Sequence, residues 1–423
     1  MNSTLLVAVL IFVATYALII SEKIHRTVLA MAGAVLMILL GVLNQEEALH
    51  GVDFNTLGLL IGMMVIVGIA KDSGMFQFVA IWASKMGKGK PLPIFLLLGL
   101  ITAVFSAFLD NVTTVLLMVP VTFVVANNLK INPLPYLIGI ILLSNIGGTA
   151  TLIGDPPNIL IGSAAKIPFN DFLIHLGPIV VVVTVVTLAL LALWYRKSLV
   201  ASKEAQASIM QFNPKEALSD YKLLYKSLFV LALVLAGFFT HSITHLEGAT
   251  IALGGAALLL LLTMNDPEHH LRDVEWTTIF FFTGLFILVG GLEAVGVIEF
   301  LADKLIEVTG GEPVPLTLSI LWGSAFFSAA IDNIPFVATM IPLIQNIGET
   351  GIEIGPLWWA LALGADIGGN ATIVGASANV VVTGMAGKQG HRIGFLQYMK
   401  VAVPMTLVAL VLCTVYVYFR YLS

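Results

Sequence analysis

Two Asp–Asn pairs interrupt segments of the sequence that are otherwise apolar. The first pair lies in SAFLDNVTTVLLMVP (106–120), and the second lies in SAAIDNIPFVATMIP (328–342), at an offset of 222 residues. A charged side chain at the centre of a membrane helix costs at least about 2.5–3.5 kcal/mol, so a carboxylate placed there indicates a functional site. Because hard cations prefer carboxylate and carbonyl oxygens, the two pairs predict a site for an ion such as Na+ or a proton.

A second pair of segments carries residues that break helices. NIGGTATLIGDPPN (145–158) and DIGGNATIVGASAN (366–379) each combine a glycine pair with Asn, Thr and Asp side chains. Backbone groups freed by unwinding a membrane helix are tolerated only against protein or a water-filled cavity. The N-terminus of a half-helix attracts anions, and its C-terminal carbonyls attract cations. We expect the backbone breaks at Gly147, Gly148, Gly154, Pro156, Pro157, Gly368, Gly369 and Gly375.

The four interrupted segments are expected to converge on one site. Its acids would be Asp110, Asp155, Asp332 and Asp366, with no intramembrane Lys or Arg to pair with them. Such acids are neutralised by protons or by bound cations. The alternative is that each aspartate only caps a half-helix by accepting backbone N–H bonds. Candidate ion or substrate ligands are Asp110, Asn111, Thr113, Thr114, Asn145, Thr149, Asp155, Asn158, Asp332, Asn333, Asp366, Asn370, Ser377 and Asn379. The Na+ candidates among them are Asp110, Asn111, Asn145, Asp155, Asp332, Asn333 and Asp366.

The composition places these segments in a polytopic α-helical membrane protein. Hydrophobic residues make up 58% of the 423 residues and charged residues 11%, far from the balance of a soluble domain. Segments 3–20, 27–43 and 176–194 are each about as long as the roughly 20 helical residues that cross a bilayer. Cys413 is the only cysteine, which excludes an intrachain disulfide and a thiolate metal cluster. The expected surroundings are lipid, and no cofactor and no nucleic-acid partner are expected.

The chain reads as two copies of one unit. VDFNTLGLLIGMMVIVGIAKDSG (52–74) aligns with VEWTTIFFFTGLFILVGGLEAVG (274–296), and the interrupted segments follow in the same order. We expect a first repeat over 1–194, a cytoplasmic linker over 195–223 and a second repeat over 224–423. Each repeat would hold about five transmembrane helices and one re-entrant hairpin. The hairpins are expected at about 93–126 and 315–348, and the unwound helices at about 135–165 and 357–384.

Five crossings per repeat require the second repeat to be inverted, and the distribution of basic residues agrees. With both termini outside, every Lys and Arg except Lys166, Lys304 and Arg420 falls on the cytoplasmic side, as the positive-inside rule demands. Arg26 is among the residues assigned to a cytoplasmic loop. Inverted repeats with interrupted helices are the architecture of secondary transporters, whose binding sites lie near the bilayer midplane.

The interrupted segments also carry a family resemblance. Asp-Asn-Val-Thr-Thr (110–114), the stretch from Asn145 to Asn158 and Gly-Ala-Ser-Ala-Asn (375–379) resemble the ion transporter superfamily, most closely its arsenical-pump and melanosomal P-protein branch. The chain is also similar to NhaD-type sodium/proton antiporters at Asp110, Asn111, Asn145 and Asp155. The resemblance implies scaffold and transport domains, a homodimer and elevator-type movement. Sodium–dicarboxylate members carry Ser-Asn-Thr tips and Gly-Thr-Pro-Pro-Asn, where this chain has Asp110, Asp332 and Asp155, which disfavours a di- or tricarboxylate substrate.

The sequence thus predicts an ion-coupled secondary transporter in a cell membrane, namely a prokaryotic inner membrane. Na+/H+ exchange through the midplane carboxylates and asparagines is the specific hypothesis, with a small ion as substrate and Na+ or H+ as coupling ion. The alternatives are a Na+- or H+-coupled permease for arsenite, another oxyanion or an organic anion such as citrate, and an anion or cation channel. No protease motif and no Walker A loop occurs, so an enzyme is not expected, although a separate ATPase subunit stays possible.

Overall fold

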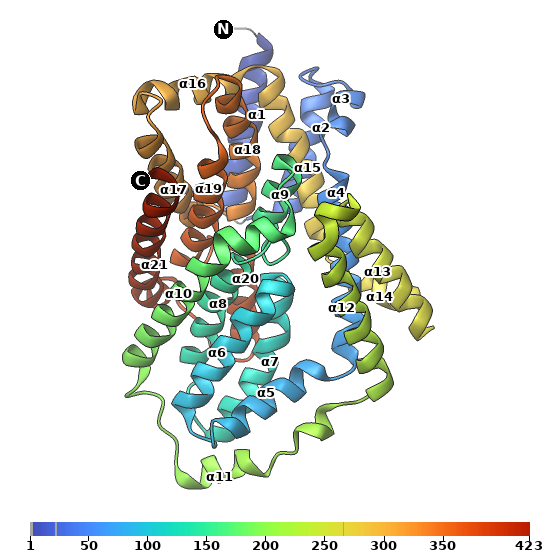
Figure 1. Cartoon of the computed structure of the whole chain (residues 1–423), viewed down its shortest axis with the longest axis vertical. Helices are drawn as coiled ribbons and strands as arrows, with labels where there is room; N and C mark the ends of the chain where they lie inside the picture. The colour runs from blue at the N-terminus through green and yellow to red at the C-terminus, as the bar shows by residue number, and fades with distance from the viewer. Residues whose placement is uncertain (1–2, 22, 265) are drawn as a thin grey trace.

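The structure, a computed structural model, describes residues 3–21, 23–264 and 266–423, and every regular element in these ranges is a helix (Figure 1). The longer helices are α1 (Ser3–Ile20), α2 (Arg26–Leu39), α4 (Phe54–Asp72), α5 (Met75–Met86), α6 (Pro91–Phe108), α7 (Asn111–Leu129), α8 (Leu134–Gly148), α9 (Pro156–Ala165), α10 (Phe169–Tyr195), α12 (Tyr221–Thr244), α13 (Gly248–Thr263), α15 (Trp276–Ala294), α16 (Val297–Thr309), α17 (Pro313–Ala330), α18 (Asn333–Glu349), α19 (Gly355–Gly368), α20 (Ser377–Lys388) and α21 (Phe395–Val417). The short elements are α3 (Gln45–His50), α11 (Lys203–Gln211), η1 (Pro214–Ala217), α14 (Pro267–Arg272), η2 (Gly369–Ala371) and η3 (Tyr418–Leu422).

Helix length and composition confirm the all-α membrane fold. Within the described ranges, nine helices are long and apolar enough to cross a membrane, and α2, α8 and α13 are shorter apolar helices. Many of their large hydrophobic side chains are exposed on the outer surface of the bundle, as expected where lipid is the solvent. The expected linker, 195–223, contains α11 and η1. The inverted orientation and the re-entry of the hairpins from one side stay predictions.

The two halves of the chain interlock through their broken helices. In the first half α6 packs against α8, and in the second half α17 packs against α19. Across the halves, α20 packs against α7, and α9 packs against α18. Figure 1 shows the red α20 among the cyan and green helices α6, α7 and α8. Each short helix that follows a break therefore lies on the paired helices of the opposite half, and the breaks face one another.

The helix breaks lie where glycine and proline predict them. A Cβ atom on Gly147 would come within 2.1 Å of the carbonyl oxygen of Ala103, and one on Gly148 within 2.5 Å of that of Gly154. On the other side, a Cβ on Gly368 would lie 2.3 Å from Ala325 Cα. Real Cβ atoms do not approach backbone so closely, so only glycine permits the contact between the unwound segments and their partner helices.

The remaining predicted breakers act in the same way. Gly369 and Gly375 face each other as Gly148 and Gly154 do, with a Cβ on Gly369 falling 2.6 Å from the carbonyl oxygen of Gly375. Pro156 and Pro157 open α9, where a missing N–H costs nothing.

Candidate functional site

The tips of the two helix pairs meet around one carboxylate. We call Asp110–Asn111, between α6 and α7, the first tip, and Asp332–Asn333, between α17 and α18, the second tip. The Asn111 amide donates to Asp155 Oδ2 at 2.6 Å, and the Asn333 amide lies 3.4 Å from Asp155 Oδ1. Asp155 is 1% exposed and lies within electrostatic range of the other three predicted acids. The structure therefore brings the four aspartates together.

A chain of amide groups links the two unwound segments. Asn145, fully buried, accepts from the Asn111 amide at 3.0 Å and donates to the side-chain oxygens of Asn370 at 2.9 Å and Asn379 at 2.8 Å. The backbone oxygen of Asn370 in turn accepts from the Tyr398 hydroxyl at 2.8 Å. These amides come from both halves, so the network ties the first break to the second.

Asn158 and Asn379 each donate hydrogen bonds to backbone carbonyls of the unwound segment that precedes them. The Asn158 amide donates to the Thr151 carbonyl at 3.0 Å, and the Asn379 amide donates to the Thr372 carbonyl at 2.8 Å. The Thr149 hydroxyl bonds to the Asn145 carbonyl at 2.9 Å, one turn back along α8. These three predicted ligands thus have structural roles. Asn158 and Asn379 satisfy backbone oxygens that the unwinding leaves free, whereas Thr149 adds a second bond to a carbonyl that its own backbone N–H already reaches.

Several buried oxygens of the site have no hydrogen-bond partner within the described part of the chain. They are both carboxylate oxygens of Asp366, the side-chain oxygens of Asn111 and Asn158, and the Thr114 hydroxyl. Asp366 is 0% exposed, and its polar neighbours are Thr149 and Asn158. A buried polar group without a partner costs about 1–3 kcal/mol, and a charged one costs more. Oxygens gathered in this way favour a bound cation or a proton.

The two tip aspartates are helix caps as well as site residues. Asp110 accepts from the Thr113 backbone N–H at 2.8 Å and from the Thr113 hydroxyl at 2.5 Å. Asp332 accepts from the Ile334 N–H at 3.1 Å and from the Ser377 hydroxyl at 3.1 Å. The capping alternative holds for both, and it leaves Asp332 with an oxygen available to a further partner.

That further partner is Arg26, and the prediction that no arginine reaches the acids is wrong. Arg26 Nη1 lies 2.5 Å from Asp332 Oδ2 and 2.9 Å from Ser377 Oγ, and the guanidinium carbon lies 4.9 Å from the centre of the Phe281 ring. Arg26 is the first residue of α2, and a basic residue at the edge of an apolar segment is ordinarily interfacial. Its pairing with a residue 306 positions away leaves no local signal in the sequence.

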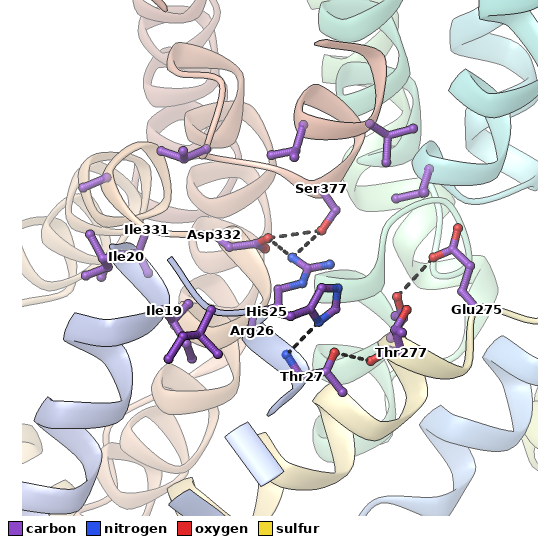
Figure 2. Close-up of a pocket in the computed structure, with 17 residues that line it drawn as sticks. Ile19, Ile20, His25, Arg26, Thr27, Glu275, Thr277, Ile331, Asp332 and Ser377 are labelled. Carbon is purple, nitrogen blue, oxygen red and sulfur yellow. Dashed lines mark hydrogen bonds and ion pairs between the residues drawn. The ribbon is translucent and has the colours of Figure 1, made fainter. Parts of the chain in front are cut away.

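A cavity of about 520 Å³ opens beside this ion pair. Figure 2 shows Arg26 pointing at Asp332 and Ser377, with Glu275 and Thr277 on a neighbouring wall. Glu275, also absent from the predicted set, accepts from the Thr278 hydroxyl at 3.1 Å and interacts electrostatically with Arg26. The cavity is therefore lined by an arginine, two carboxylates, several hydroxyl groups and aliphatic side chains.

The comparisons with known proteins identify the family. The family model described as "CitMHS: Citrate transporter" matches residues 16–364. The chain belongs to the CitMHS citrate transporter family. A 46 kDa membrane protein of Mycobacterium leprae is 43% identical over 425 residues, covering 98% of this chain and 99% of that protein. A Mycobacterium tuberculosis protein described as an uncharacterized transporter is 43% identical over 424 residues, covering 98% of each.

More distant similarity bears on the resemblance and on the fold. The human P protein is 35% identical over 494 residues, covering 97% of this CitMHS-family transporter and 59% of the P protein, which confirms the predicted resemblance to that branch. The solved structure of the YdaH transporter of Alcanivorax borkumensis matches with a TM-score of 0.60 and 14% identity over 99% of this chain and 98% of that one. At that identity the match concerns the fold alone.

Proposed function

We propose that this CitMHS-family transporter couples the movement of its substrate to a cation, Na+ or H+, bound between the first tip and the start of α9. The observation that carries the proposal is the set of buried oxygens without donors around Asp155 and Asp366. Of the three ion pairs in the described ranges, only Arg26–Asp332 involves a site acid, so Asp110, Asp155 and Asp366 have no basic partner. A hard cation bound by carboxylate and amide oxygens would satisfy them.

Exchange of Na+ for H+ is the specific function we propose, since one bound cation species can replace the other on the same carboxylates. A cation-coupled anion permease is the second candidate. It is favoured by Arg26, because a guanidinium on a cavity wall is a binding group for carboxylates and oxyanions. The family description points in the same direction.

The mechanical part of the proposal follows from the inverted repeats expected from the sequence. Two re-entrant hairpins and two unwound helices would form a transport domain that moves, as an elevator, against the scaffold of a homodimer. We place the chain in a prokaryotic inner membrane with both termini outside.

Purified protein in proteoliposomes with an acidic lumen and an internal pH dye tests the coupling. Na+, Li+, K+, arsenite and citrate are added outside, one at a time. Na+/H+ exchange predicts that Na+ or Li+ alone dissipates the gradient, and that Asp155→Asn abolishes the response. Asp303→Asn, at an exposed aspartate of α16, is the matched control and should respond as the unchanged protein does.

Each other outcome has a definite meaning. A response only to an anion would refute exchange and support the permease. Ion flux that no gradient of a second ion can drive would refute coupling and indicate a channel. An unchanged Na+ response in Asp155→Asn would remove that carboxylate from the mechanism.

A further inference from the structure

The two helix breaks are built alike in atomic detail. Ser106 Oγ donates to the Ser144 carbonyl at 2.6 Å, and Ser328 Oγ donates to the Ala365 carbonyl at 2.6 Å. The asparagine closing each break and the aspartate capping each tip also correspond, as described above. The surroundings of the second tip, including the start of α20, can therefore be compared position by position with those of the first tip and the start of α9.

The comparison reveals a difference in charge. The first tip and the start of α9 carry two carboxylates, Asp110 and Asp155, and neither takes part in an ion pair of the described ranges. At the second site Asp332 is present, but the position that aligns with Asp155 is Ala376. The fourth acid, Asp366, aligns with Asn145. Its polar neighbours, however, are Thr149 and Asn158 of the first break, and it takes part in no ion pair of the described ranges. The second tip and the start of α20 thus have one carboxylate, and that carboxylate is paired with Arg26.

The guanidinium is held where a bound cation would be expected. It contacts the tip carboxylate and the hydroxyl of Ser377, the first residue of α20, and its other side packs over the Phe281 ring. The C-terminus of α17 ends at the same tip, and the carbonyls at a helix C-terminus favour positive charge. Arg26 is only partly exposed, at 27% of its side-chain area, so the contacts restrict it to this position.

The second repeat has no basic residue at the position that corresponds to Arg26. At the repeat offset of 222, the residue corresponding to Arg26 is Gly248, which begins α13 as Arg26 begins α2. Gly248 has no side chain, and it lies beside Leu59 and Asn55 of α4. The protein therefore supplies its own cation at the second site and none at the first.

We propose that Arg26 is a tethered cation that occupies the second of two corresponding cation sites, so that the chain binds one mobile cation instead of two. The inference rests on the proposed cation coupling, which it deepens by assigning the number of coupled ions. Neutralising Arg26 while keeping Asp332 and Ser377 should open a second Na+ site. Lysine at the same position should keep that site closed, because the charge remains.

Radioactive Na+ binding to purified protein, measured as ions bound per chain at saturation, tests this directly. The expected result is about one Na+ for the unchanged protein and for Arg26→Lys, and about two for Arg26→Gln. The Hill coefficient of Na+ activation should rise with the number of sites, which sets its upper limit. The double variant Arg26→Gln with Asp332→Asn should return to the unchanged number, since the second site then has no carboxylate.

Asp332→Asn alone keeps the proposal falsifiable if Arg26→Gln fails to fold. It should bind as many Na+ ions as the unchanged protein, and the loss of one ion would show that Asp332 binds a mobile cation, which would overturn the proposal. Equal Na+ binding by folded Arg26→Gln and the unchanged protein would also overturn it while leaving cation coupling intact. No Na+ bound by the unchanged protein and one by Arg26→Gln would support the tethered cation and refute Na+ as the coupling ion.

Discussion

Replacement of Asp366 by asparagine separates the stability of the site from its function. The Asp366 side chain is fully buried, and neither of its carboxylate oxygens has a hydrogen-bond partner within the described part of the chain. Such a group costs about 1–3 kcal/mol when neutral and more when charged. Asparagine has nearly the same shape and still leaves a buried polar group, but it removes the additional cost of the charge. Asp366→Asn should therefore be more stable than the unchanged protein in Na+-free buffer.

The order should reverse when Na+ is added. A ligand that binds only the folded state at a concentration 100 times its Kd stabilises that state by about 2.7 kcal/mol. The unchanged protein should gain about this amount, whereas Asp366→Asn, lacking a ligand, should gain far less. The melting temperature of Asp366→Asn should therefore be the higher one without Na+ and the lower one at high Na+ concentration, with shifts of a few degrees.

The chain provides its own probe for this experiment. Cys413 is the only cysteine and is fully buried, so a thiol-reactive dye labels the protein only when it unfolds. Asp303→Asn, which changes an exposed aspartate, serves as the control and should follow the unchanged protein at every Na+ concentration. If Asp366→Asn were less stable without Na+ and gained as much from Na+ as the unchanged protein, the role assigned to the unpaired carboxylate would be refuted.

Three further changes, one of them with a matched control, test the packing that positions the site, with the same thiol assay. Gly368→Ala should prevent folding or abolish transport, because its Cβ would lie 2.3 Å from a backbone atom of α17. Gly384→Ala is the control: its Cβ would have nothing within 4 Å, so it should stabilise α20 by about 0.5–1 kcal/mol. Asn145→Ala should lower the free energy of unfolding by at least about 2 kcal/mol, because the hydrogen bonds from its side-chain amide to Asn370 and Asn379 are both lost. A loss below about 0.5 kcal/mol would contradict the proposed network. Tyr16→Phe removes a 3.0 Å hydrogen bond to a carbonyl of α18 and should cost about 1 kcal/mol without affecting Na+ binding.

The helices and their breaks could be predicted from the sequence because both are local properties. About 20 apolar residues define a span whatever packs beside it. Glycine pairs and the prolines at 156–157 restrict the backbone of their own segment, and the structure ends α8 at Gly148 and begins α9 at Pro156. The Asp–Asn pairs likewise mark the ends of helices, since aspartate is a strong N-cap wherever it is placed.

The convergence of the four aspartates could also be predicted, because the repeated order of segments implies that corresponding parts of the two halves meet. The hydrogen-bond partners of the asparagine side chains could not be predicted. Which way the Asn158 amide points depends on how the unwound backbone folds over it. The structure directs its NH2 group at the carbonyl of Thr151 and leaves its oxygen without a donor among the described residues.

Arg26 shows most clearly what only the tertiary structure decided. Its position at the start of an apolar segment is equally compatible with a solvated loop residue and with a partner of Asp332. The choice depends on the packing of α2 against α15, which directs the side chain at a tip 306 residues away. The sequence by itself determined the spans, the breaks and the acids, because each depends on neighbouring residues. The structure alone decided which acid is neutralised within the protein, because that depends on distances between segments far apart in the chain.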